Sequence, residues 1–281
     1  MPPVPFILIA DDFGLSHGVS DAILDLLAKN RLSGTGSMVN QPVWASRADD
    51  LRPFQGHRDL GLHLTLTLGA PLGPAPTLAP EGHFLPLSRL MAKCFSNALP
   101  RREIRDEIIR QITAFRDRTG RFPDFIDGHQ HVHVLPVIRH ALFDALEILN
   151  PPYKPWLRVP SDHMGSIMAR GVSVGKALFI AFLSLGFTRK AKRAGYRVND
   201  TFSGVRSFDP EVDFAREFQR FLLVQGRHHL VMCHPGVSDE SLAALDPVTT
   251  ARDQEYEFFK SDAFEAMLQA YSLRIARFDD V

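Results

Sequence analysis

The amino-acid sequence predicts a single-domain α/β protein built as an irregular, TIM-like (β/α) barrel. Apolar runs typical of buried parallel strands alternate with amphipathic segments of helical length. Residues with catalytic potential directly follow several of these runs, as they do at the carboxyl-terminal edge of a parallel barrel. Because no fixed-period repeat and no polar linker divides the chain, we expect one domain over residues 1–281.

The amino-terminal third of the chain supplies three predicted strands and one predicted helix. A continuous apolar run at 6–10 indicates a buried strand. Ser16 is a suitable N-cap for a helix over 18–30, whose apolar residues recur at helical spacing. Further strands are expected at 34–39 and at 59–67, the second because its threonines favour extended backbone.

The remainder of the chain continues the same alternation after an irregular excursion at about 70–98. That excursion is rich in proline, glycine and leucine, which is typical of a lid or a substrate-binding loop. Isoleucine and phenylalanine recur on one face of 101–119, so this segment is predicted to be helical. The later elements are a helix over 136–149 and strands at 125–127, 157–159, 201–205 and 229–233.

Composition excludes several classes of protein. Lys+Arg and Asp+Glu are equal at 32 each, so no overall field recruits nucleic acid or an acidic membrane. The two cysteines, Cys94 and Cys233, are far apart and in no metal-binding pattern, which argues against a disulfide framework. The first residues lack the basic start and the apolar core of a signal peptide, so we expect a cytoplasmic location.

An apolar helical segment at about 165–195 is the one part of the chain that suggests contact with a membrane. Its apolar stretch, 176–187, is shorter than the roughly 20 residues needed to span a bilayer, so stable insertion is not expected. Four basic residues follow it, and cations are favourable at a helix carboxyl terminus. We therefore favour a packed helix, which could form the contact of a homodimer, over an interfacial helix that meets a lipid-linked substrate.

Two adjacent carboxylates, Asp11 and Asp12, follow the first predicted strand. Side by side they repel one another unless a cation or a proton compensates their charge. A divalent metal would supply that compensation, with one carboxylate as its ligand and the other as a base that takes a proton from water. The alternative is a pair of loop or helix-capping aspartates without chemistry.

Histidines follow two other predicted strands. A single histidine such as His63 is more often a hydrogen-bonded core residue. It becomes a candidate ligand because other strand ends also carry carboxylates and histidines. His129, His131 and His133 recur at period two, which in extended backbone puts them on one face about 6.6 Å apart. That spacing is too long for three ligands of one ion, so we expect one ligand, with the other two lining the pocket or orienting neighbours. We choose His129 as the ligand because it is nearest the end of the predicted strand. Asp127 could orient a ligating imidazole, although a surface tract with adventitious metal affinity is the alternative.

Two further residues are candidates from their positions. His234 lies in a Cys-His-Pro-Gly turn after the strand at 229–233, where it could act as general acid on a departing amine or be a turn residue without chemistry. Arg158, after the strand at 157–159, is a candidate for substrate contact.

Taken together, the segments 10–16, 61–67, 127–133 and 233–236 resemble the signatures of the YdjC-like carbohydrate deacetylases. The resemblance runs from about residue 5 to about residue 240. It implies an irregular barrel of the type shared by glycoside hydrolases and deacetylases. It also implies one divalent cation, Mg²⁺ or Zn²⁺, held by an aspartate and two histidines. Carried over by position, the ligands are Asp12, His63 and His129, the general base is Asp11 and the acid is His234; the two aspartates could also exchange roles.

The family's activity would be removal of an N-acetyl group from an amino sugar, with release of acetate. The expected partner is an N-acetylated oligosaccharide or glycoconjugate. Residues 160–200 do not match the sugar-binding region expected of a chitobiose-specific enzyme, and related family members act on glycosylated lipids. A glycoside hydrolase is the rival enzyme. Its two catalytic carboxyl groups must lie roughly 5–9.5 Å apart with a sugar between them, and adjacent aspartates are poorly suited to this. A non-catalytic metal- or sugar-binding protein is the third alternative, and a phosphoesterase is disfavoured because no glycine-rich loop is present.

Overall fold

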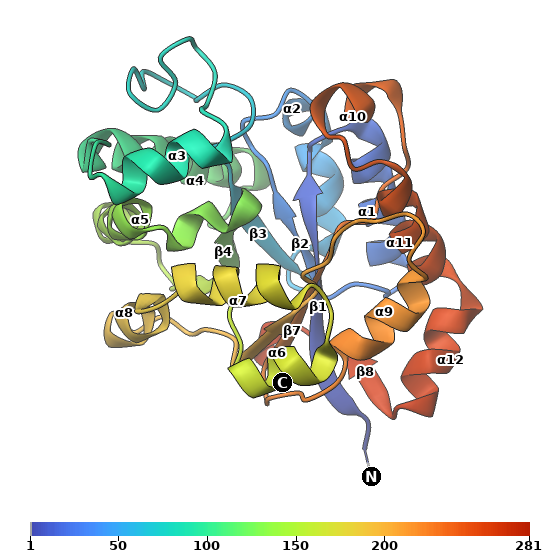
Figure 1. Cartoon of the computed structure of the whole chain (residues 1–281). Helices are drawn as coiled ribbons and strands as arrows, with labels where there is room; N and C mark the ends of the chain where they lie inside the picture. Colours follow the sequence, from blue (N-terminus) through green and yellow to red (C-terminus); the bar gives the residue numbers. More distant parts are fainter. Residues whose placement is uncertain (1) are drawn as a thin grey trace.

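Eight strands form one parallel sheet in the computed structural model, which describes residues 2–281 (Figure 1). The strands lie in the order β5-β4-β3-β2-β1-β7-β6, and β8 pairs with the beginning of β1. A bridge between Leu157 and Val198 brings the two ends of this order together, so the sheet curls into a barrel. The strands are β1 (Val4–Phe13), β2 (Gly34–Ser37), β3 (Asp59–Leu64), β4 (Phe125–Gly128), β5 (Trp156–Leu157), β6 (Thr201–Ser203), β7 (His229–Cys233) and β8 (Leu273–Ile275).

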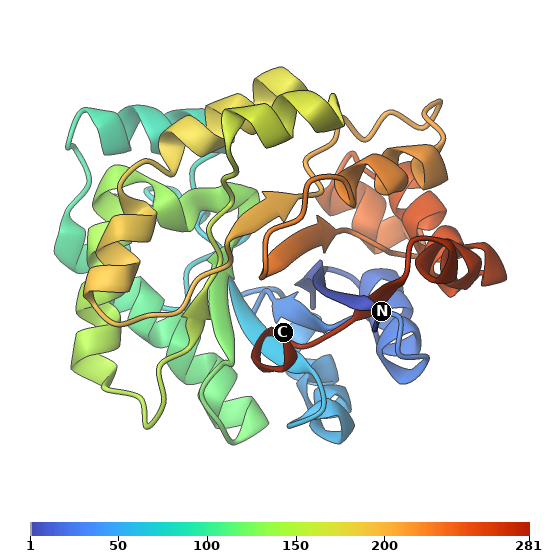
Figure 2. The ribbon, with the colours of Figure 1, turned by 90° about the horizontal axis from the view of Figure 1, so that it is seen from below.

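Helices surround the sheet on its outer side (Figures 1 and 2). None of them, within residues 2–281, combines the length and the apolar character that crossing a bilayer requires. The α-helices are α1 (His17–Ala28), α2 (Trp44–Arg47), α3 (Leu87–Phe95), α4 (Arg101–Thr119), α5 (Pro136–Leu149), α6 (Met164–Arg170), α7 (Val174–Leu183), α8 (Phe187–Arg193), α9 (Phe214–Phe221), α10 (Glu240–Leu245), α11 (Thr250–Lys260) and α12 (Asp262–Ala270). The 3-10 segments are η1 (Ala48–Phe54), η2 (His129–Val134) and η3 (Phe278–Asp280).

The apolar pattern of β1 explains how the barrel is filled. Phe6 and Leu8 belong to the core between the sheet and its helices, whereas the alternate residues Ile7 and Ile9 belong to a second buried cluster. In that cluster the ring of Trp156 stacks between the rings of Phe125 and Phe278, at centroid distances of 4.3 and 4.7 Å. Since η3 and β8 occupy the amino-terminal side of the sheet, the opposite edge is left for polar residues.

The predicted α/β barrel is confirmed, and most predicted elements lie where the pattern indicates. Ser16 caps α1 by accepting a hydrogen bond from the Val19 amide at 3.2 Å. The helices predicted at 101–119 and 136–149 have those bounds. The excursion at 70–98 is less irregular than expected, because it contains α3. The apolar segment at 165–195 forms three short helices, α6, α7 and α8.

Candidate metal centre

Five strands deliver polar side chains to the carboxyl-terminal edge of the sheet. Their register fixes this, because His63 on β3 pairs with Asp127 on β4, and Ala10 on β1 pairs with Cys233 on β7. The residues that follow these positions therefore lie at one level of the barrel. The structure brings Asp11, Asp12, His63, His129 and His234 to this edge, as the sequence predicts.

An irregularity in β1 turns both aspartates toward the site. In a regular strand neighbouring side chains point to opposite faces, which would separate Asp11 from Asp12. Here the register of β1 against β2 shifts between Ala10 and Phe13, and Asp12 has a φ of 73°. Aspartate is among the few residues that tolerate this left-handed backbone. The adjacent carboxylates can therefore serve one site.

Asp12, His63 and His129 form a compact group of potential metal ligands. The Asp12 Oδ1 atom lies 3.3 Å from His63 Nε2 and 3.1 Å from His129 Nδ1. The three atoms lie within 4.8 Å of one another. Asp12 and His63 are buried, whereas His129 retains partial exposure. One carboxylate oxygen and two imidazole nitrogens are a donor set that suits a divalent transition metal or magnesium.

The opposite nitrogen of His63 is held by Asp127. His63 Nδ1 and Asp127 Oδ1 are 2.7 Å apart, which fixes the ring so that Nε2 faces Asp12. On β2 a glycine leaves room for this pair: a Cβ on Gly36 would lie 3.3 Å from His63 Nδ1. Burial lowers the pKa of His63, but Asp127 and then Asp11 outweigh it and raise that pKa to about 10. Asp127 thus provides the imidazole support that its position predicts.

Arg252 of α11 binds the second oxygen of Asp12. Its Nη2 donates to Asp12 Oδ2 at 2.6 Å and to Asp246 Oδ2 at 2.6 Å, and the guanidinium is buried. Burial raises the pKa of Asp12, but Arg252 and the two histidines outweigh it, so the pKa is held well below its usual range. Asp12 is therefore ionised and has only Oδ1 directed to the histidines.

Asp11 is clamped by a different arginine. Arg158 donates from Nη1 to Asp11 Oδ2 at 2.7 Å and from Nη2 to Asp11 Oδ1 at 2.6 Å. The same Nη2 lies 2.7 Å from Asp127 Oδ2. Burial raises the pKa of Asp11 above its usual value, and Arg158 opposes that rise. Asp11 is thus oriented by a bidentate ion pair and is more basic than an exposed carboxylate.

These contacts form a continuous chain of alternating charges, which runs through Asp11, Arg158, Asp127, His63, Asp12, Arg252 and Asp246. This network holds His63 by its Nδ1 atom and Asp12 by its Oδ2 atom, so His63 Nε2 and Asp12 Oδ1 remain available to an ion. His129 has no such support. Such prior positioning of ligands is typical of metal centres. The donor set and its orientation therefore fit a divalent cation.

His234 lies beside Asp11, on the turn that follows β7. Its Nε2 is 3.9 Å from Asp11 Oδ2, and its ring meets the edge of Phe208 at a centroid distance of 5.0 Å. The Nδ1 atom is buried and has no hydrogen-bond partner among residues 2–281. Burial holds the pKa of His234 well below its usual range, so the imidazole is neutral at pH 7. Glu255 of α11 accepts a hydrogen bond from the His234 amide at 2.5 Å and fixes the turn.

The histidine tract at 129–133 is not extended, which corrects the period-two interpretation. Residues His129–Val134 form η2, and Gln130 and His131 have φ values of 53° and 59°. Consecutive left-handed residues reverse the chain, so the three rings point in different directions. Only His129 reaches Asp12.

Two of the three residues predicted to contact substrate lie in the interior of the protein. Arg158 and His133 are both fully buried. Arg158 instead binds Asp11 and Asp127, and its carbonyl oxygen accepts a hydrogen bond from His133 Nε2 at 2.9 Å. Their contact with substrate stays a prediction, and the contacts that the structure shows for both side chains lie within the protein. His131 is partly buried, with its ring against that of Phe202 at 5.8 Å.

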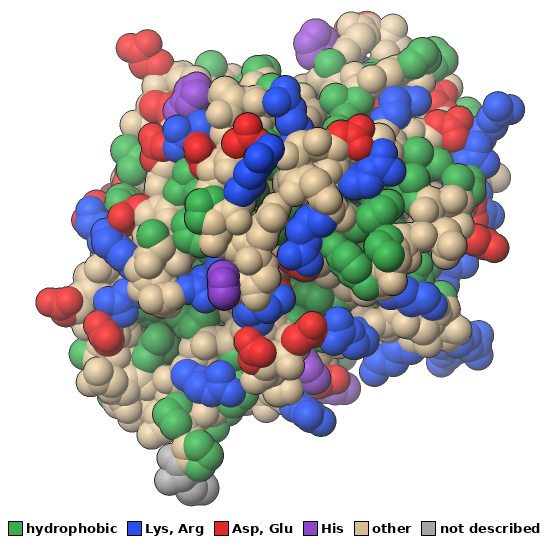
Figure 3. Space-filling model, turned by 180° about the vertical axis from the view of Figure 1, so that it is seen from behind, with side chains coloured by type: hydrophobic (Ala, Val, Ile, Leu, Met, Phe, Trp, Pro, Cys, Tyr) green, Lys and Arg blue, Asp and Glu red, His purple; other side chains and the backbone are tan. Residues whose placement is uncertain are grey.

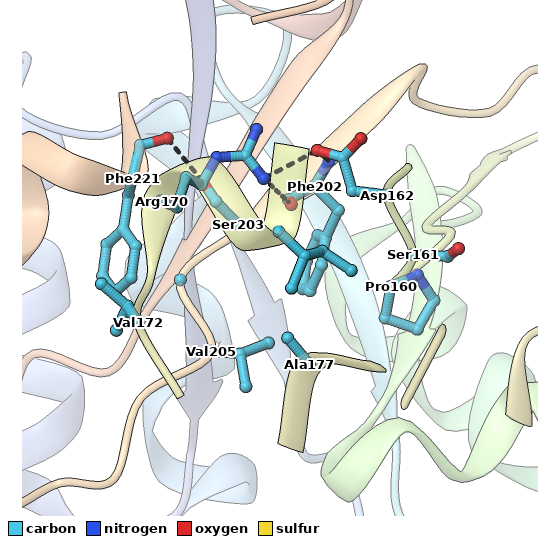
Figure 4. Close-up of a pocket in the computed structure, with 12 residues that line it drawn as sticks. Pro160, Ser161, Asp162, Arg170, Val172, Ala177, Phe202, Ser203, Val205 and Phe221 are labelled. Carbon is cyan, nitrogen blue, oxygen red and sulfur yellow. Dashed lines mark hydrogen bonds and ion pairs between the residues drawn. The ribbon is translucent and has the colours of Figure 1, made fainter. Parts of the chain in front are cut away.

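A small hollow of about 20 Å³ lies between β6 and the helices α6 and α7 (Figure 4). Phe202, whose ring contacts His131, lies in its wall together with Ile167 of α6 and Ala177 of α7. Figure 4 shows Arg170 in the wall, where it donates to the Asp162 carboxylate and to the Phe202 carbonyl oxygen, both by Nη1. None of Asp12, His63 and His129 lines the hollow.

The sequence did not reveal Arg252, Asp246 or Glu255. They lie on or near α11, in a segment without a motif, and their contact with the site is formed only when α11 packs beside α1 and β7. The feature that sets Arg252 apart is its burial, and the burial of an arginine cannot be recognised from the sequence.

Comparison with known proteins gives consistent relationships. A family model described as YdjC-like protein matches residues 5–270. A carbohydrate deacetylase of Mus musculus is 32% identical over 52% of this chain and 48% of its own length, and a chitooligosaccharide deacetylase of Enterobacter sp. is 38% identical over 47% and 51%. The chain thus spans about half the length of these curated relatives. A carbohydrate deacetylase of Halalkalibacterium halodurans is 27% identical over 89% of this chain and 93% of its own length.

Two solved structures share the fold. One, from Enterococcus faecalis V583 and provisionally assigned to cellobiose-phosphate cleavage, has a TM-score of 0.71 at 22% identity and covers 99% of this chain and 98% of its own. The other, a peptidoglycan N-acetylglucosamine deacetylase, has a TM-score of 0.51 at 10% identity and covers 97% and 85%. Both matches extend over nearly the whole chain, in agreement with one α/β barrel.

Proposed function

This chain belongs to the YdjC-like family, and from that premise we propose that it is a metal-dependent deacetylase of N-acetylated amino sugars. The observation that carries the proposal is the group Asp12, His63 and His129, placed beside an oriented carboxylate, Asp11, and a histidine, His234. The names of the curated relatives, carbohydrate deacetylase and chitooligosaccharide deacetylase, support this substrate class.

In the proposed centre Asp12, His63 and His129 hold one divalent cation, Mg²⁺ or Zn²⁺. When bound, such a cation would lower the pKa of a water molecule and stabilise negative charge on the acetyl oxygen. Arg252 keeps Asp12 ionised, and Asp127 keeps the His63 ring in place. Since Arg252 occupies one oxygen of Asp12, this carboxylate would contribute its other oxygen.

Asp11 is the proposed general base. Its pKa is raised by burial, so it accepts a proton more readily than an exposed aspartate, and Arg158 orients both of its oxygens. His234 is neutral at rest and 3.9 Å from Asp11 Oδ2. It is therefore suited to receive a proton in the site and to deliver it to the departing sugar amine, while acetate leaves.

A glycoside hydrolase is less compatible with these contacts. Such an enzyme needs one carboxyl group that carries a proton and faces the glycosidic oxygen. Asp12 is held ionised by Arg252, and both oxygens of Asp11 accept hydrogen bonds from Arg158. Neither carboxyl group is arranged as a proton donor.

The test is an acetate assay on a panel of N-acetylated saccharides and glycoconjugates, with Mg²⁺ or Zn²⁺ added to the purified protein. We expect acetate release that stops with a chelator and returns when the metal is restored. Cleavage of a glycosidic bond that survives the chelator would assign the protein to the glycoside hydrolases instead. Stable metal binding without acetate from any substrate would support the non-catalytic alternative.

A further inference from the structure

The most apolar helix of the protein is largely uncovered. Of the ten residues of α7, only Ile180 is buried. Phe179 and Phe182 are 49% and 61% exposed, and Leu185, just beyond the helix, is 64% exposed. Large apolar side chains usually pack against a neighbouring element, whereas residues 2–281 leave about half or more of each of these three exposed.

The neighbouring helix α6 extends the same apolar surface. Met164 and Met168 lie one turn apart on α6 and are 69% and 57% exposed. The helices α6 and α7 contact one another, and Figures 1 and 2 both place them on the outside of the molecule. We refer to Met164, Met168, Phe179, Phe182 and Leu185 as the apolar face.

The segment that carries the apolar face is strongly basic. Residues 164–199 contain seven lysines and arginines and no aspartate or glutamate, in a chain whose net charge is zero. On α8, Arg189, Lys192 and Arg193 are exposed, and none of them forms an ion pair within the described part of the chain. By contrast, basic and acidic side chains are interspersed on the face in Figure 3, which is opposite to that of Figure 1.

From this juxtaposition we propose that α6, α7 and α8 dock the protein peripherally on an anionic lipid bilayer. Exposed phenylalanine, leucine and methionine enter the boundary between headgroups and acyl chains, and nearby cations attract anionic headgroups. Both features are present on one continuous segment of this chain. Contact at the surface is sufficient, because no described helix could cross the bilayer.

A second copy of the chain is a poorer occupant of the same face. A two-fold dimer would place the same patch on both subunits, so two segments rich in lysine and arginine would lie against each other. Arg170 and Arg197 pair with Asp162 and Asp279, but the exposed cations of α8 have no ion-pair partner within residues 2–281 to offset this repulsion. An anionic surface supplies the charge that a second copy lacks.

The proposed docking side adjoins the candidate site. The hollow beside His131 is lined by Ile167 of α6 and Ala177 of α7, on the inner sides of the two docking helices. Docking would therefore hold this side of the barrel near the membrane. The inference rests on exposure and charge alone, so it does not depend on the proposed function.

Sedimentation with vesicles tests the proposal. We expect the purified full-length chain to bind phosphatidylcholine vesicles that contain phosphatidylglycerol at least about tenfold more tightly than phosphatidylcholine alone. The double variant F179S/F182S should lose at least about tenfold in binding to the anionic vesicles. Leu245→Ser on α10, which lies away from α7 in both ribbon views, removes another exposed leucine and should bind normally.

A pair of charge reversals separates local from overall electrostatics. R189E/R193E should weaken binding about tenfold or more. K29E/R52E changes net charge equally at the end of α1 and in η1, two elements that Figure 2 shows away from α7, and it should have a much smaller effect. Equal losses in both variants, or no preference for anionic vesicles, would overturn the proposal. The face would instead belong to a second copy if two results were found together. The protein would fail to sediment with vesicles, and light scattering would show a dimer that the F179S/F182S substitutions dissociate.

Discussion

The carboxyl-terminal edge of the sheet and the α6–α8 segment use charge in opposite ways. At the sheet edge, buried carboxylates alternate with Arg158 and Arg252, and nearly every charge has a partner within 3 Å. On α8, exposed arginine and lysine have no such partner within residues 2–281. Buried charges must be paired, whereas exposed charges are solvated and can serve a partner outside the chain.

The difference predicts where substitutions matter. A change at the sheet edge removes one member of a buried network and leaves its neighbours unpaired. A change on the exposed side of α7 removes a side chain that contacts little of the folded protein. The same chemical change should therefore cause large losses in one region and small ones in the other.

The largest expected effect is on catalysis. Asp11→Asn should lower kcat by about 10²–10⁴-fold, because the amide cannot accept a proton from water. Since Asp11 is outside the proposed ligand set, metal stoichiometry should be unchanged. Steady-state acetate release together with metal analysis of the purified variant checks both statements. Phe182→Ser is the matched change on α7 and should keep the wild-type kcat on soluble substrates. Near-normal activity of Asp11→Asn would refute the role of Asp11 as the base.

Arg252 should be important for stability. Arg252→Gln would leave the buried Asp12 carboxylate without its main cation, and loss of one partner of a buried pair typically costs about 3–5 kcal/mol. An added divalent cation should restore part of this loss, because it supplies positive charge to the same carboxylate. Urea denaturation with chelator and with metal measures the difference. A variant as stable as wild type in chelator would show that the ion pair is dispensable.

Residues differ in how far their roles could be predicted from the sequence. Asp12, His63 and His129 were predictable, because strand ends in a parallel barrel meet at one edge. The bulge that turns Asp11 and Asp12 to one side and the left-handed turn at Gln130 and His131 were not, since both depend on packing around the strands.

The contribution of α11 was also unpredictable from sequence, for a different reason. Arg252 is separated from Asp12 by 240 positions, and no local pattern marks its partner. Arg158 was predicted to contact substrate, and its ion pair with Asp11 could not be predicted because it follows from tertiary structure. Local patterns therefore predicted which side chains meet at this edge, and the network that orients them required the fold.

A buried histidine outside the network should make stability depend on pH. Burial lowers the pKa of His229 to about 3, below the value of 6.5 that applies when the chain is unfolded. Its contribution is therefore complete above pH 6.5 and is lost as the pH falls from 6.5 toward 3. Between pH 7.5 and 5, wild type should lose about 2 kcal/mol more than His229→Gln. Chemical denaturation at each pH measures the free energy of unfolding of both proteins. The same change with pH in wild type and in His229→Gln would contradict the prediction.

Metal affinity should also change with pH. Because Asp127 and Asp11 raise the pKa of His63 to about 10, the metal-free imidazole is protonated at neutral pH and must release its proton to bind an ion. Between pH 7 and 9 the apparent affinity should rise about tenfold per pH unit. Calorimetry in buffers of different ionisation enthalpy should report about one proton released per ion; affinity independent of pH would place the metal elsewhere.

The measurement that tests the central claim most directly is a metal titration of the chelator-treated protein and its ligand variants. The arrangement of Asp12, His63 and His129 predicts one divalent ion per chain, with affinity reduced by at least about 10²-fold in Asp12→Ala, His63→Ala and His129→Ala. His140→Ala, on the outer helix α5, is the matched control and should bind as wild type does. Unchanged affinity in all three ligand variants would show that these residues do not share an ion.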